Sequence, residues 1–268
     1  MARAVLLNLG YLETDLVRSD SGNQGSFELF DEKPVKFKRV QKLFRTLRLK
    51  GVKVQYRRLK PADWVTRWKD QWKPAALTKT LDVVPVWCKS KYKLRRGRDF
   101  ILMDTLLSFG TGLHETTQIM AQFIEDNRGI FKTFLDIGTG TGILGFVALK
   151  NEAAKVIGID IGQLSVQAAR DNMKANDLYF NVKKADIKTF KSSLSFDFVA
   201  ANLITDDLIT HARKILSLVK NNGLLAVSGI SLTNLAKIRK AYGLLPLKCI
   251  RISKGKQWSG LLYQKMMS

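Results

Sequence analysis

The segment that most constrains the fold is a glycine-rich stretch, Asp136–Gly142 (DIGTGTG). The run TFLDIG that leads into it is short and almost continuously apolar, which predicts a strand buried on both faces. A helical pattern starts at about Thr141. Glycines are needed where a chain turns sharply from strand to helix and lets its backbone approach a ligand closely. The stretch therefore predicts an α/β fold with a ligand site at the end of this strand.

The same alternation of strand and helix is repeated further along the chain. The apolar runs KVIGID, FDFVAANL and GLLAVSGI alternate with helical patterns over Ser165–Ala175 and Leu208–Val219. Alternation of this kind predicts a doubly wound, mostly parallel sheet.

Three segments are predicted from the sequence. Residues 1–60 are expected to form a small basic α+β domain, with a strand in AVLLNL, a turn or loop at Ser19–Gly25 and a helix from Pro34 to Gly51. Residues 61–77 are expected to form a linker helix, because three tryptophans four residues apart would line one helix face. Residues 78–268 carry the strand–helix repeat.

Polar residues stand where the predicted strands end. Asp160 ends the second strand, and a carboxylate there can accept hydrogen bonds from both ribose hydroxyls of a nucleoside cofactor. Asp186 ends the run VKKAD, where such folds contact adenine, and Asn202 follows the next strand at the ligand crevice. The residues expected at a nucleoside site are therefore Asp136, Gly138, Gly140, Asp160, Asp186 and Asn202.

The glycines fit two kinds of nucleoside cofactor. Gly140, Gly142 and Gly145 also satisfy the dinucleotide motif GxGxxG, with Asp160 about twenty residues further on. The upstream Asp136, the asparagine at the end of the fourth strand and the absence of a phosphate in S-adenosylmethionine (SAM) all favour that cofactor. A class I SAM-dependent methyltransferase is thus the preferred hypothesis. A hydride-transfer enzyme and a non-catalytic nucleotide binder are the alternatives.

A second motif is more specific. The segment Phe109–Thr117 (FGTGLHETT) resembles the element FGTG-x-H-x-TT that the PrmA type, the bacterial methyltransferase of large-subunit ribosomal protein L11, carries ahead of its glycine motif. The resemblance covers about residues 60–268. It continues through Asp63-Trp64 and Trp68, the VPVW run, DIGTGTGIL, Asn172, Asn176, Asn202-Leu203, GLLAVSGI and Trp258.

The resemblance implies a Rossmann-like class I methyltransferase sheet, preceded by a domain that recognises the substrate. It implies methyl transfer from SAM to lysine or α-amino groups of a ribosomal protein. The family's cofactor contacts, carried over position by position, are Thr117, Gly138, Asp160 and Asn202.

The chain departs from the family pattern at several positions. Glu115 stands where the family has proline, and Leu203-Ile204-Thr205 replaces Ile-Leu-Ala. We expect Glu115 to be a solvated carboxylate or, less favoured, to attract a lysine ammonium. His114 is the one candidate proton acceptor, although a loop or capping role suits it better, and His211 is expected at the surface. The missing Pro-Pro-Tyr after Asn202 argues against amide or adenine methylation.

Charge is unevenly distributed along the chain. The net charge is +22, and the segment Lys33–Arg98 holds 22 lysines and arginines against three aspartates. Such a block favours an anionic partner, with ribosomal RNA preferred over a merely solvated surface or an anionic membrane. Two rival functions follow: an RNA methyltransferase, and a non-catalytic RNA-binding assembly factor.

The remaining composition places few demands on the protein. Cys88 and Cys249 have neither disulfide nor metal-ligand spacing, which indicates reduced thiols and no metal. No signal-peptide layout and no apolar stretch of about 18 residues is found, so no membrane span is expected. We therefore expect a cytoplasmic protein.

Overall fold

The computed structural model describes residues 16–21, 24–29, 72–104 and 112–267. The chain divides into two compact units, 1–64 and 65–268. In the first unit, β1 (Leu16–Ser21) and β2 (Gln24–Leu29) pair as an antiparallel hairpin in which Ser21 faces Gln24. The loop predicted over Ser19–Gly25 is therefore wrong for most of its length. The strand predicted in AVLLNL and the helix from Pro34 to Gly51 lie outside the described residues.

The second unit starts with a small three-stranded sheet. Strand β4 (Leu81–Pro85) pairs antiparallel with β3 (Ala75–Ala76) and parallel with β5 (Asp99–Met103). A 3-10 helix, η2 (Val86–Lys91), connects β4 to β5. The predicted linker helix lies outside the described residues as far as residue 71, and Ala75–Ala76 form a strand rather than its last turn.

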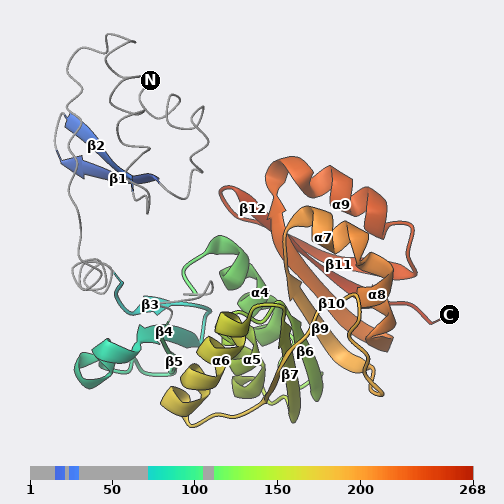
Figure 1. The fold of residues 1–268 in the computed structure, drawn as a ribbon, viewed down its shortest axis with the longest axis horizontal. Helices are drawn as coiled ribbons and strands as arrows, with labels where there is room; N and C mark the ends of the chain where they lie inside the picture. The colour runs from blue at the N-terminus through green and yellow to red at the C-terminus, as the bar shows by residue number, and fades with distance from the viewer. Residues whose placement is uncertain (1–15, 22–23, 30–71, 105–111, 268) are drawn as a thin grey trace. The chain divides into compact units, whose positions relative to one another are not determined.

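A seven-stranded sheet forms the centre of this unit (Figure 1). Its order is β11-β12-β10-β9-β6-β7-β8. Strands β6 to β10 run parallel, whereas β12 is antiparallel to both of its neighbours, β10 and β11. The strands span Thr133–Ile137 (β6), Lys155–Asp160 (β7), Asn181–Lys184 (β8), Phe196–Asn202 (β9), Val219–Ser231 (β10), Leu247–Lys254 (β11) and Trp258–Lys265 (β12).

Helices cover both faces of the sheet (Figure 1). One face packs against α4 (Glu115–Glu125), α5 (Ile143–Lys150) and α6 (Gln163–Asn176). The other packs against α7 (Thr205–Thr210), α8 (Ala212–Ser217) and α9 (Leu235–Tyr242), the last preceded by the short η3 (Leu232–Asn234). No helix within the described part of the chain has the length and apolar character needed to cross a membrane.

The two covered faces explain the continuous apolar runs in the sequence. Successive strand residues point to opposite faces, so Phe134 and Phe198 join one core cluster while Leu135 and Val199 join the other. All four side chains are fully buried. Since both faces are apolar, the parallel strands show no polar alternation, and the doubly wound sheet predicted from this pattern is confirmed.

Two asparagines of α6 attach the small sheet to the large one. The Asn176 side chain accepts a hydrogen bond from Leu102 N–H and donates one to the Leu102 carbonyl, both at 2.7 Å. Asn172 does the same with Asp104, at 2.8 and 3.2 Å, and also donates to the carbonyl of Thr141 at 3.1 Å. The side-chain amides thus pair with the backbone at and just beyond the end of β5 in place of a neighbouring strand.

Candidate functional site

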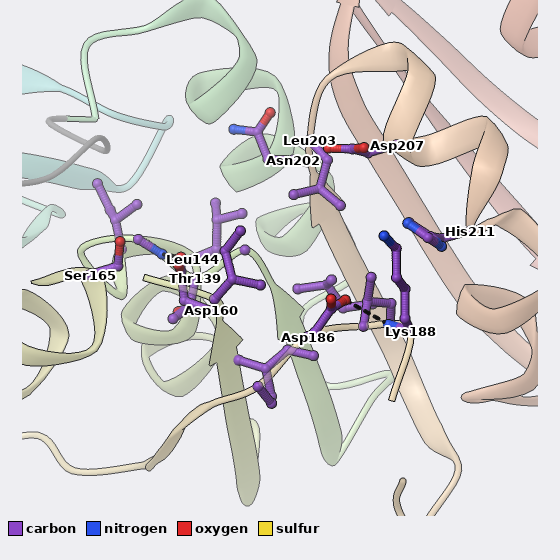
Figure 2. A pocket seen from close by; sticks show the side chains of 18 of the residues that line it. Thr139, Leu144, Asp160, Ser165, Asp186, Lys188, Asn202, Leu203, Asp207 and His211 are labelled. Atoms are coloured by element: carbon purple, nitrogen blue, oxygen red, sulfur yellow. Dashed lines mark hydrogen bonds between the residues drawn. The ribbon is translucent and has the colours of Figure 1, made fainter. Parts of the chain in front are cut away.

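A cavity of about 310 Å³ opens at the carboxyl ends of β6, β7 and β9 (Figure 2). Strands β6 and β9 are neighbours in the sheet, yet the chain leaves them toward opposite flanks. This is the switch point where open α/β sheets bind ligands. Six of the residues expected at the cofactor site line the cavity, namely Thr117, Gly138, Gly140, Asp160, Asp186 and Asn202.

The glycine turn lines the cavity with Gly138 and Gly140. Gly138, Gly140 and Gly142 have φ angles of +73°, +53° and +84°, a region that side chains rarely adopt. A Cβ atom on Gly138 would lie 2.6 Å from Cδ2 of Leu203. The turn therefore requires glycine both for its backbone conformation and for the close packing of Leu203.

Asp160 is held in place by the same turn. Its Oδ2 accepts a hydrogen bond from Gly140 N–H at 2.9 Å, and its Oδ1 accepts one from Gly162 N–H at 2.8 Å. Each oxygen keeps further acceptor capacity, so the half-buried carboxylate can still receive two hydroxyl groups. Across the cavity, Asp186 Oδ1 accepts from the Lys188 backbone N–H at 2.9 Å (Figure 2).

Asn202 is oriented by a residue that was not expected at the site. Its Nδ2 donates to Thr116 Oγ1 at 3.2 Å. The Thr116 hydroxyl also lies within hydrogen-bond distance of Nδ1 of His114, at 2.7 Å. Thr116 is 1% exposed, so the hydrogen bond to this buried hydroxyl group fixes the Asn202 side-chain amide that borders the cavity. The sequence signal for Thr116 was its place beside Thr117 in the FGTGLHETT element.

Asp136 lies beneath the cavity rather than on its wall. Its Oδ2 accepts a hydrogen bond from Thr139 Oγ1 at 2.7 Å. Burial, together with the nearby negative charge of Asp160, raises the pKa of the Asp136 carboxyl to about 7. Asp136 therefore supports the glycine turn from a buried position and is not among the described residues that line the cavity.

His114 and Glu115 start helix α4. His114 is its N-cap, where Nδ1 accepts from Thr116 N–H at 3.4 Å, and its ring packs edge-on against Trp258 with centroids 5.2 Å apart. Burial lowers the pKa of His114. The Glu115 carboxylate accepts the backbone N–H groups of residues 256, 257 and 258 at 2.9, 3.0 and 3.2 Å. Three backbone hydrogen bonds thus hold this carboxylate, which is not merely solvated as expected.

Three further ionisable side chains, which the sequence pattern does not predict at the site, line the cavity. Figure 2 shows Lys188, Asp207 and His211 opposite Asp160. His211 was expected on the outer surface of one helix over Leu208–Val219. The chain instead breaks at His211 between α7 and α8, and this break turns its ring to the cavity wall. A single-helix pattern carries no signal for such a break.

The cavity suits a nucleoside that carries no phosphate. Apolar side chains, including those of Ile159 and Ile187, line it together with the carboxylates of Asp160 and Asp186. Lys188 is the one lysine or arginine among the described residues that line it. One lysine offers little to neutralise a dinucleotide's pyrophosphate, whereas the carboxylates accept hydrogen bonds from hydroxyl and amino groups well.

Comparison with known proteins gives a consistent result. The family model of the ribosomal protein L11 methyltransferases (PrmA) matches residues 16–266, which includes the β1–β2 hairpin as well as the segment where the resemblance was noted. A ribosomal protein L11 methyltransferase of Alkaliphilus metalliredigens is 31% identical over 75% of this chain and 63% of its own length. One from Caldanaerobacter subterraneus is 32% identical over 80% of this chain and 69% of its own length.

Among solved structures, a ribosomal protein L11 methylase from Lactobacillus delbrueckii subsp. bulgaricus superposes with a TM-score of 0.67. It is 27% identical, and the match covers 73% of this chain and all of that one. The aligned part of this chain spans about two thirds of the length of the full relatives, at 63% to 69%.

Proposed function

Because the chain belongs to the PrmA family of ribosomal protein L11 methyltransferases, we propose that it transfers methyl groups from SAM to ribosomal protein L11. The observation that carries the proposal is the cavity at the sheet's switch point. It brings Gly138, Asp160 and Asn202 together with Thr117. These are the four positions to which the resemblance assigns cofactor contacts.

The cofactor-binding roles follow from the chemistry of each residue. Asp160 accepts hydrogen bonds from the ribose hydroxyls, and Asp186 accepts one from the exocyclic amino group of adenine. The glycine turn at Gly138 lets the methionine part lie against backbone, and Asn202 faces it with an amide held by Thr116. SAM, when bound, supplies a methyl group on a sulfonium, which is a good leaving group.

The protein's contribution to transfer is alignment and exclusion of water. The accepting group is a lysine or α-amino nitrogen, which has to be neutral before it attacks. His114 is not assigned the proton acceptor role, since its Nδ1 caps α4. Planar amide substrates are disfavoured because Leu203-Ile204-Thr205, without proline or an aromatic ring, follows Asn202.

The test is methyl transfer by the full chain. Purified protein, ribosomal protein L11 and SAM with a tritiated methyl group are incubated with and without RNase, and labelled L11 is hydrolysed to identify the methylated amino acid. We expect label in L11 as methyl-lysine or an α-N-methyl residue, insensitive to RNase. Asp160→Asn is expected to reduce the rate by at least about 100-fold, because it removes a charged acceptor from the ribose.

Asp177→Asn is the matched control. Asp177 is an exposed residue in a left-handed conformation that asparagine tolerates, and it is not among the residues that line the cavity. Its rate should equal that of the wild type. Label in ribosomal RNA instead of L11 would establish the RNA methyltransferase alternative. No label in either, together with RNA binding, would establish the non-catalytic assembly factor.

A further inference from the structure

One charged segment has no part in the cofactor site. Residues 89–98 (KSKYKLRRGR), here the cationic loop, hold six lysines and arginines and no acidic residue. The loop runs from the end of η2 to the start of β5 in the small sheet. It is the described end of the basic block that extends from Lys33.

A buried carboxylate anchors the loop. Asp82 on β4 is 1% exposed and accepts hydrogen bonds from Tyr92 Oη at 2.5 Å and from Arg98 Nη2 at 2.7 Å, and it also pairs with Arg95. Burial by itself would raise the pKa of Asp82, but these hydrogen bonds lower it to about 2. Arg98 further donates to the carbonyls of Thr78 and Leu81, at 2.8 and 2.7 Å. Two of the six cations therefore fix the shape of the loop.

The other four cations are left for a partner. Lys89, Lys91, Lys93 and Arg96 are all exposed, and no carboxylate among the described residues pairs with them. Their charges are held close together on an anchored backbone, although they repel one another. An arrangement that concentrates positive charge without local neutralisation is suited to a polyanion.

The remaining surface of the loop identifies the class of polyanion. Leu94, 54% exposed, is its one large exposed apolar side chain. A protein interface would need clustered aromatic or aliphatic anchors, and a membrane-bound segment would need an apolar face to insert. Neither is present within residues 89–98. RNA needs only cations for its phosphates, and it lies beside a ribosomal-protein substrate, a point that rests on the proposed function.

We propose that the cationic loop binds the phosphodiester backbone of RNA, with Lys89, Lys91, Lys93 and Arg96 as the phosphate contacts. Binding of this kind is independent of base sequence and weakens linearly with the logarithm of the salt concentration. The loop then binds RNA independently of cofactor binding in the cavity.

The experiment measures binding of the full chain to a fluorescent 20-nucleotide oligouridylate by anisotropy, from 50 to 300 mM KCl. The loop variant is Lys89→Gln, Lys91→Gln, Lys93→Gln and Arg96→Gln together. A matched control carries Lys183→Gln, Lys191→Gln, Lys240→Gln and Arg213→Gln, which remove the same charge from exposed positions elsewhere. Asp82 and its partners are untouched in both, so both should fold.

We expect the loop variant to bind at least about 10-fold more weakly at 100 mM KCl, with a salt slope reduced by about 3, since each contact with single-stranded RNA contributes about 0.7. The control should differ from the wild type by less than about 2-fold. Equal affinities and slopes for loop variant and control would overturn the proposal.

Tighter loop-dependent binding of the wild type to polyglutamate of equal charge, or to phosphatidylserine vesicles, than to the RNA would overturn it as well. The assay contains neither SAM nor L11, so its outcome is separate from that of the methylation test.

Discussion

At the scale of single residues, the Asp136 carboxyl should make stability depend on pH. Its pKa in the folded protein, about 7, is higher than its ordinary value of 3.8 because it is buried. The folded state therefore binds this proton more tightly than the unfolded state does. Protonation of Asp136 contributes its full stabilisation below pH 3.8, and this contribution is lost as pH rises through 7. Between pH 5 and pH 8 the wild type should lose about 3 kcal/mol of unfolding free energy from this group.

The Asp136→Asn variant isolates that effect. Asparagine still offers Thr139 an acceptor and does not titrate, so the variant should gain stability relative to the wild type as pH rises from 5 to 8. Urea unfolding of both proteins at four pH values measures the difference, with the exposed Asp177→Asn change as control. A difference that is constant over this range would show that Asp136 is not protonated in the folded state.

Residue-scale prediction from the sequence was good where a residue's place in a motif decides its position. Gly138, Asp160 and Asn202 all lie at strand ends, and the parallel sheet brings such ends to one edge. Thr116 and His211 were missed as site residues because their orientation depends on packing. Thr116 reaches the site through a hydrogen bond with Asn202, which lies 86 residues further along the chain. His211 reaches the cavity because the chain breaks there between two helices.

At the scale of elements, helix α4 holds one loop at each end. Glu115 in its first turn accepts three N–H groups of the β11–β12 turn, which also places a negative charge at the positive end of the helix dipole. Glu125 in its last turn accepts N–H groups of Lys79 and Thr80, at 3.2 and 3.1 Å. Hydrogen bonding lowers the pKa of Glu115, and also that of Glu125 against the opposing effect of burial.

The two glutamates provide matched controls for each other. Glu115→Ala should speed amide hydrogen exchange in the β11–β12 turn by about 10-fold, the loss of roughly 1.4 kcal/mol of local stabilisation. It should leave the amide exchange rates of Lys79 and Thr80 unchanged. Glu125→Ala should speed exchange at Lys79 and Thr80 and leave the β11–β12 turn unchanged. Exchange measured by NMR at pH 7 reports both. If either variant accelerated amide exchange equally in both loops, α4 itself would be unravelling, and the effect of each glutamate would not be local.

Elements were predicted well where the pattern alone determines them. The strands of the parallel sheet follow from apolar runs, and α6 at Gln163–Asn176 extends the predicted Ser165–Ala175 by a few residues. The hairpin β1–β2 was missed because its strands carry polar residues such as Arg18, Ser19 and Asp20, which also favour turns. Pairing with a partner strand overrides that local preference.

At the scale of the whole molecule, the described residues that line the cavity all belong to the unit 65–268, so cofactor binding should stabilise this unit. S-adenosylhomocysteine, the demethylated product, binds without reacting. At 100 times its Kd it should add about 2.7 kcal/mol. For a unit of this size that corresponds to a rise in Tm of roughly 5–10 °C.

Differential scanning calorimetry of the full chain measures this shift, and the variants separate the two proposals. Asp160→Asn should abolish the rise in Tm, while the four-glutamine loop variant should retain it, because the loop lies outside the cavity. With oligouridylate as the ligand, the rise in Tm should be retained in Asp160→Asn and lost in the loop variant. If Asp160→Asn kept the full shift, the ligand would not be held by the carboxylate at the end of β7. The cofactor assignment would then fail even if the fold and the family were unchanged.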